Sequence, residues 1–150
     1  MKSVDAVSGC FMIVRRDAME QIGLLDERFF IYSEDIDWCR RFKHQGWEVV
    51  FNPAPQATHY SGASSGNEPV RFSMEKQRAI LKYWAKHHSW PWRMLMFLIL
   101  FNHHFLRVLA GQSISLWKPS RKAEIEGRMK ASLECLRDLL TFQKTSIEHL

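Results

Sequence analysis

The chain has 150 residues, of which 46% are hydrophobic and 25% are charged, which suits one domain of ordinary size or part of a larger protein. This hydrophobic content excludes wholesale disorder. Three cysteines without any C-x-x-C pair suggest neither a disulfide framework nor a zinc ribbon, so reduced thiols are expected. The net charge of +5 is uneven. Residues 1–75 carry eight Lys or Arg against eleven Asp or Glu (−3), and residues 76–150 carry thirteen against five (+8).

The first 60 residues are predicted to combine short strands with short helices. Val4–Val14 is expected to form one or two strands broken at Ser8-Gly9, where glycine allows a bulge or a close backbone approach. A short helix is expected at Ala18–Ile22, with Asp17 as its cap and Gly23 at its end. Further strands are predicted at Phe29–Tyr32, Trp47–Phe51 and Gln56–Tyr60.

Three carboxylates crowd the start of the next predicted helix. Ser33 suits the N-cap position, and Glu34, Asp35 and Asp37 follow it directly. Acidic residues at a helix N-terminus each stabilise the helix by about 0.3–1 kcal/mol, and this dipole effect accounts for Glu34 and Asp35. It does not explain the aromatic residues around them, which are typical of sites that bind a sugar ring. These aromatic residues are Phe29, Phe30, Tyr32 and Trp38.

After Pro69 the chain is predicted to be helical and basic. Helices are expected at Arg71–His88 and Lys122–Phe142, and Met94–Phe101 between them is the most apolar run. Asn102-His103-His104 follows it, and the whole stretch Trp90–Gly111 is too short and too polar for a membrane span of about 20 apolar residues. Two interpretations stay open: a helical hairpin packed on the preceding domain, or docking on an anionic membrane surface, which Trp and Arg at the edges and the +8 charge favour. No nucleic-acid recognition motif is present.

Residues 4–65 resemble, in order, the C-terminal half of an inverting family 2 glycosyltransferase with a GT-A fold. Bacterial rhamnosyltransferase-like enzymes of polysaccharide and cell-wall assembly are the most similar subgroup. The resemblance rests on a joint pattern: Ser8-Gly9, "GLLDERFF", Glu34-Asp35, Gly46-Trp47 and His59.

The resemblance implies an α/β chain with a partial GT-A fold that lacks its N-terminal nucleotide-binding half. Residues 1–70 would form the acceptor and base region of the catalytic domain. Outside the resemblance, the charge and apolar pattern of residues 71–150 predict a basic, amphipathic helical region that associates with a membrane. The predicted location is the cytoplasm, peripheral on the inner face of the cell membrane.

The resemblance also implies roles for individual residues. Asp35 would act as general base, taking the proton from an acceptor hydroxyl that attacks the anomeric carbon opposite the nucleotide. Glu34 and Asp37 would orient acceptor hydroxyls, and Ser8-Gly9 would lie near the donor sugar. Trp38 would either stack on a sugar or simply pack in the core. The donor would be a nucleotide-diphosphate sugar, with rhamnose as one candidate, and the acceptor a glycan or a lipid-linked sugar.

A divalent metal, Mg²⁺ or Mn²⁺, is implied by the same resemblance. His59 would complete its coordination, but the family's Asp-x-Asp ligands are not found upstream of Val4. The Ser61–Gly66 loop would close over the donor. The pairs His87-His88 and His103-His104 make poor two-ligand sites, because helix neighbours point about 100° apart, so interfacial or solvated histidines are expected there.

Because the nucleotide-binding half is missing, we expect this chain to be a fragment, a truncated reading frame or half of a split enzyme. No Walker or G-x-G-x-x-G loop replaces that half. The rival interpretation is a non-catalytic remnant or a membrane-associated partner subunit without its own nucleotide site.

Overall fold

The computed structural model describes residues 1–60, 68–117 and 119–147. The chain divides into two units, Met1–Ser64 and Ser65–Leu150, and each has its own packing. The predicted division of roles at residue 70 stays a prediction. Helices predominate in the described residues, and a single two-stranded sheet represents the β-structure of the expected α/β fold.

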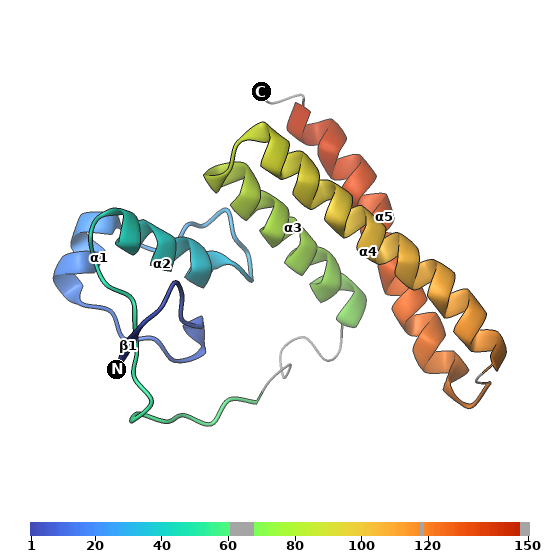
Figure 1. The fold of residues 1–150 in the computed structure, drawn as a ribbon, viewed down its shortest axis with the longest axis horizontal. Coiled ribbons are helices and arrows are strands. Elements are labelled where there is room, and N and C mark those ends of the chain that lie inside the picture. Colours follow the sequence, from blue (N-terminus) through green and yellow to red (C-terminus); the bar gives the residue numbers. More distant parts are fainter. Residues whose placement is uncertain (61–67, 118, 148–150) are drawn as a thin grey trace. The chain divides into compact units, whose positions relative to one another are not determined.

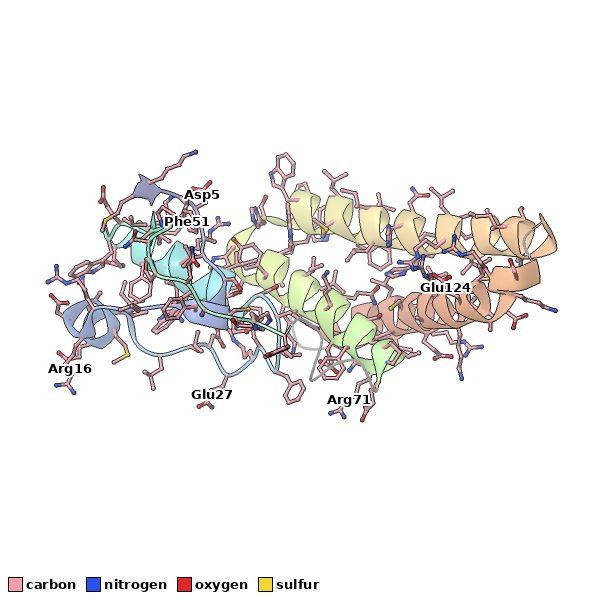
Figure 2. All side chains as sticks on the ribbon, turned by 90° about the horizontal axis from the view of Figure 1, so that it is seen from below. Asp5, Arg16, Glu27, Phe51, Arg71 and Glu124 are labelled. Atoms are coloured by element: carbon pink, nitrogen blue, oxygen red, sulfur yellow. The ribbon has the colours of Figure 1, made fainter. Side chains whose placement is uncertain are left out.

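The first unit contains two helices and a small antiparallel sheet (Figure 1). Lys2 pairs with Phe51 and Ser3 with Val50, and the Val4 amide extends the pairing by donating to the Val49 carbonyl at 2.9 Å. Figure 2 labels Phe51 on the second strand and Asp5 just after the first. The elements are β1 (Lys2–Ser3), the 3-10 turn η1 (Gly9–Phe11), α1 (Arg16–Ile22), α2 (Glu34–His44) and β2 (Val50–Phe51).

The core of this unit lies under one face of α2. Trp38, Cys39 and Phe42 recur at helical spacing and are buried, together with Ala18 of α1 and Val49 beside β2. The Trp38 indole N–H donates to the carbonyl of Gly23, at the end of α1, at 2.9 Å. This hydrogen bond and the apolar contacts fix α2, and hence its N-terminal turn, against the rest of the unit.

Several predicted strands are wrong. Around Gly9 the backbone forms the η1 turn, in which the Cys10 amide donates to the Ser8 hydroxyl, so Val4–Val14 is not a strand. Tyr32 has a φ of 68°, a left-handed value that a strand does not allow. Trp47–Phe51 shortens to β2, because the Trp47 amide still bonds the Phe42 carbonyl at the end of α2. Gln56–Tyr60 carries no strand assignment.

The second unit consists of three helices, and each contacts the other two (Figure 1). They are α3 (Pro69–His87), α4 (Trp90–Trp117) and α5 (Lys122–Ile147), with the 3-10 turn η2 (Pro119–Arg121) before the last. The predicted helices at both ends of the unit are confirmed. The apolar middle forms one helix that continues through Asn102-His103-His104. By length and composition its residues 90–114 could cross a membrane, which corrects the expectation that this stretch is too short and too polar.

Polar contacts inside the second unit join α3 to α5. The Gln77 amide donates to the Cys135 carbonyl at 2.9 Å, beside the fully buried Leu139. Arg78 forms an ion pair with the buried Asp138. Of the two histidine pairs, His87 and His88 are half-buried, whereas His103 is exposed and His104 is buried.

Candidate functional site

The Asp35 carboxylate is held by the turn that contains Gly9. Its Oδ2 accepts a hydrogen bond from the Gly9 amide at 2.8 Å, and its Oδ1 accepts one from the Ile36 amide at 2.8 Å. The backbone at Gly9 approaches so closely that a Cβ there would lie 3.4 Å from the Cβ of Asp35. The carboxylate is therefore fixed in position although its side chain is only half-buried.

The backbone before α2 places Asp35 in the first turn of the helix. Tyr32 and Ser33 both have left-handed backbone angles, with φ of 68° and 65°. The chain turns sharply there and then enters α2, where the Asp37 amide donates to the Ser33 carbonyl at 2.9 Å. Ser33 stands at the predicted N-cap, but its side chain makes no capping hydrogen bond. The N-terminal amides of α2 stabilise the negative charge that gathers at this end.

His59, which is 49 residues after Cys10 in the sequence, contacts the same turn. Its Nε2 lies 3.5 Å from the Cys10 Sγ, and the Ser8 hydroxyl lies 3.1 Å from that sulfur. This turn thus contacts Asp35 through Gly9 and His59 through Cys10. The structure brings together four residues that were predicted for the site from the sequence: Ser8, Gly9, Asp35 and His59.

An open hollow of about 680 Å³ lies beside this turn. Ser8, Cys10 and His59 contribute its polar edge, and Phe11 and Val50 belong to its largely apolar wall. A volume of this size suits a small ligand. Asp35 does not line the hollow itself but supports, through Gly9, the turn that does.

Asp37 and Trp38 point into the protein. The Asp37 carboxylate is fully buried and pairs with Arg41 at 3.0 Å, and Arg41 donates onward to the Ile22 and Leu24 carbonyls. Trp38 is 9% exposed and packs on Phe42, with ring centroids 5.1 Å apart. Both side chains hold α2 in place, and neither presents a surface to an acceptor. Of the two interpretations of Trp38, the structure favours packing.

Glu34 differs from its neighbours because one of its oxygens is buried without a partner. Among the residues that the structure describes, nothing donates a hydrogen bond to the Glu34 Oε2. A buried carboxylate oxygen without a donor is costly, so a bound hydroxyl or water at this position would be stabilised.

The residues present do not fit a complete metal site. Across residues 1–60, 68–117 and 119–147, no group of three or more His, Cys, Asp or Glu side chains could hold a metal ion. His59 is accompanied by a thiol, whereas Mg²⁺ and Mn²⁺ prefer oxygen ligands. The Mg²⁺ or Mn²⁺ prediction therefore stays a prediction that needs ligands from outside this set. The Ser61–Gly66 loop lies outside the described residues.

Two residues of the site were not predicted from the sequence. Cys10 links His59 to the Gly9 turn, and its only signal was its place beside Ser8-Gly9. Arg41 stands four residues after Asp37 on α2, which is the spacing of a helical ion pair, so this pair was open to prediction.

Comparison with known families gives the class of this protein. The family described as glycosyltransferase like family 2 matches residues 1–79, more than half of the chain. The chain belongs to this family. The match includes the whole first unit and with it Ser8, Gly9, Asp35 and His59.

Individual relatives are bacterial and archaeal sugar transferases. N-acetylglucosaminyl-diphospho-decaprenol L-rhamnosyltransferase of Mycobacterium tuberculosis is 34% identical over 92 residues, which are 61% of this chain and 30% of that protein. Rhamnosyltransferase WbbL of Escherichia coli is 38% identical over 58 residues, 39% of this chain and 22% of the relative. The hexosyltransferase Agl10 of Haloferax volcanii is 40% identical over 70 residues, 47% of this chain and 20% of the relative.

The chain thus spans less than a third of the length of the curated relatives it matches. No solved structure matches it.

Proposed function

We propose that this chain supplies the acceptor and base side of a transferase that moves a sugar from a nucleotide-diphosphate donor to a glycan or lipid-linked acceptor. The observation that carries the proposal is the Asp35 carboxylate, held by the Gly9 amide on a turn that also contacts His59. Membership of the glycosyltransferase family supports the reaction class. Rhamnose is the proposed sugar, because two relatives are rhamnosyltransferases by name.

Asp35 is the proposed general base. Each of its oxygens accepts one backbone hydrogen bond, and an ionised carboxylate has about four lone-pair positions, so both oxygens can still accept a hydroxyl proton. The acceptor O–H gives its proton to Asp35 while its oxygen forms a bond to the anomeric carbon. The bond from that carbon to the nucleotide diphosphate breaks on the opposite face, so the anomeric configuration inverts. Fixed placement of the carboxylate contributes through orientation.

Glu34 is proposed to orient the acceptor. Its buried Oε2 lacks a donor in the part of the chain that the structure describes, and an acceptor hydroxyl would supply one. Asp37 and Arg41 are assigned a supporting role, because their ion pair ties α2 to the carbonyls of Ile22 and Leu24. His59 is proposed to face the donor diphosphate from the hollow.

A second candidate is a non-catalytic partner subunit. The matched segment is 30% of the M. tuberculosis relative, so most of that enzyme has no counterpart in the alignment. In this alternative the chain would retain the site residues by descent and would not transfer sugar.

A segment exchange tests the proposal. The 92 matched residues of the M. tuberculosis relative are replaced by those of this chain, and transfer from a panel of nucleotide-linked sugars to a lipid-linked N-acetylglucosamine acceptor is measured. Turnover with a nucleotide-linked rhamnose at more than a tenth of the parent rate supports the proposal. A folded hybrid that binds nucleotide but transfers no sugar from the panel supports the non-catalytic alternative.

A further inference from the structure

Helix α4 carries an apolar stripe that stays exposed among the described residues of its own unit. Its inner face, which includes Phe97, Phe101 and His104, packs toward α3 and α5. With 3.6 residues per turn, the opposite face collects exposed residues within one arc. We call this arc the outer stripe; it consists of Trp92, Leu95, Leu98, Ile99, Leu106 and Leu109, and the exposed Asn102 is the polar residue among them.

The outer stripe is too apolar for a helix face left in water. Leu98 and Leu106 are 53% and 58% exposed, and only 17% of the most apolar window of the helix is buried. A core helix of a soluble protein would be mostly buried. Large exposed apolar patches mark surfaces that bind a partner or a membrane.

The charge around the stripe indicates which partner covers it. No Asp or Glu stands between Glu75 and Glu124, and nine Lys or Arg lie in that interval. On α4 the exposed Arg107 flanks the stripe, and exposed Trp90 and Trp92 stand at its first turn. Arginine and tryptophan beside an apolar face suit the headgroup region of a bilayer, and anionic lipid attracts each basic residue near its surface.

The packing of α5 argues against a spanning helix. α5 lies alongside α4 (Figure 1), so closely that a Cβ at Gly111 of α4 would collide with Met129 of α5 and touch Ile125. The same stretch of α5 exposes several charged side chains: Glu124, labelled in Figure 2, with Glu126, Arg128 and Lys130. If α4 crossed a bilayer, these charges would enter the hydrocarbon, where each costs about 2.5–3.5 kcal/mol or more.

We propose that α4 lies flat on an anionic lipid bilayer, with the outer stripe inserted among the headgroups and upper acyl chains and with α5 on the water side. Amphipathic helices bind membranes in this orientation through apolar burial and attraction between charges. This surface is independent of the Asp35 turn, so it can be present whether or not the chain transfers sugar.

Vesicle sedimentation of the full chain tests the proposal. The chain is expected to pellet with vesicles of phosphatidylcholine and phosphatidylglycerol at low salt, and to bind pure phosphatidylcholine at least tenfold more weakly. The double variant Leu98→Gln/Leu106→Gln should lower partitioning at least tenfold, because two leucines are removed from the lipid-facing stripe. The matched control Leu24→Gln/Leu25→Gln changes two exposed leucines of the first unit and should leave binding within twofold. Circular dichroism checks that both variants fold.

Three results would overturn the proposal. One is a wild-type chain that stays in the supernatant with anionic vesicles. Another is a Leu98→Gln/Leu106→Gln variant that binds as well as the wild type but changes from dimer to monomer in sedimentation velocity, which would assign the stripe to a second copy. The third result comes from the depth of insertion. If α4 lies flat, lipids brominated near the headgroup should quench tryptophan fluorescence more than lipids brominated at the chain ends. Equal or stronger quenching from the chain ends would indicate a spanning helix, and this measurement needs no variant.

Discussion

The Asp35 Oδ2 and the Gly9 amide nitrogen lie 2.8 Å apart, in a hydrogen bond that joins residues 26 positions apart in the sequence. This bond attaches the start of α2 to the η1 turn, which in turn contacts His59 through Cys10. Because the bond is charge-assisted and its donor is backbone, it fixes the carboxylate more firmly than a mobile side chain would.

Side chains of increasing size at Gly9 should displace Asp35 progressively. A Cβ at this position would sit 3.4 Å from the Asp35 Cβ and 3.6 Å from its Oδ2, so Gly9→Ala is expected to be nearly tolerated, whereas the branches of Gly9→Val must push the carboxylate away. In the segment-exchange hybrid, Gly9→Val should lower kcat by about 10²-fold, the size of effect that follows from a misplacement of about 1 Å. Nucleotide affinity, measured by calorimetry, should stay within a few-fold. Equal kcat for the Ala and Val variants would contradict the positioning role of this contact.

Removal of the Asp37 charge should destabilise the first unit without a direct effect on chemistry. Asp37→Asn leaves the guanidinium of the largely buried Arg41 without its carboxylate, and breaking a buried pair costs about 3–5 kcal/mol. Urea unfolding followed by tryptophan fluorescence measures the loss. As a control, Asp17→Asn breaks the exposed pair with Arg15 and should cost less than about 1 kcal/mol. If the two variants unfold at the same urea concentration, Asp37 has no special structural role.

The stability of the helical unit should fall in mild acid because of His104. Burial, with smaller contributions from His103 and Arg107, lowers the pKa of His104 from 6.5 to about 4. Between these values the unfolded chain binds a proton that the folded chain does not, so the free energy of unfolding decreases as the pH falls from 6.5 toward 4. The total loss is about 3 kcal/mol at pH 4.

Far-UV circular dichroism during urea unfolding at pH 7 and pH 5 checks this dependence. The difference between the two pH values should shrink in His104→Gln and persist in His103→Gln, whose parent side chain is exposed. A difference that is unchanged in His104→Gln would assign the acid sensitivity to other groups.

Helices were predicted better than strands, for a physical reason. A helix is specified locally, by apolar residues at helical spacing and by residues such as Gly23 and Pro69 at its ends. The bounds of α1, α3 and α5 and the start of α2 were therefore predicted close to those observed. A strand needs a partner that the sequence does not name. The run Phe29–Tyr32 has strand-like residues, but the left-handed backbone at Tyr32 makes it part of a turn.

The candidate site depended on family resemblance more than on local pattern. Spacing alone explained Glu34 and Asp35 as helix-dipole residues, and nothing in the sequence placed Gly9 against Asp35 or Cys10 against His59. The fully buried position of Asp37 was also not predicted, because three carboxylates in one turn suggested three exposed groups. The Arg41 partner four residues later could have indicated that burial.

The central claim is that Asp35 removes the proton from the acceptor. The most direct test is the Asp35→Asn variant of the segment-exchange hybrid, with kcat and nucleotide Kd measured on the same preparation. The single amide oxygen can still accept the Gly9 hydrogen bond, at the loss of the one from Ile36, but the amide is no base. The kcat should therefore fall by about 10²–10⁴-fold while the nucleotide Kd changes less than about threefold. Turnover above a tenth of the unsubstituted hybrid would contradict the assignment of Asp35 as the base.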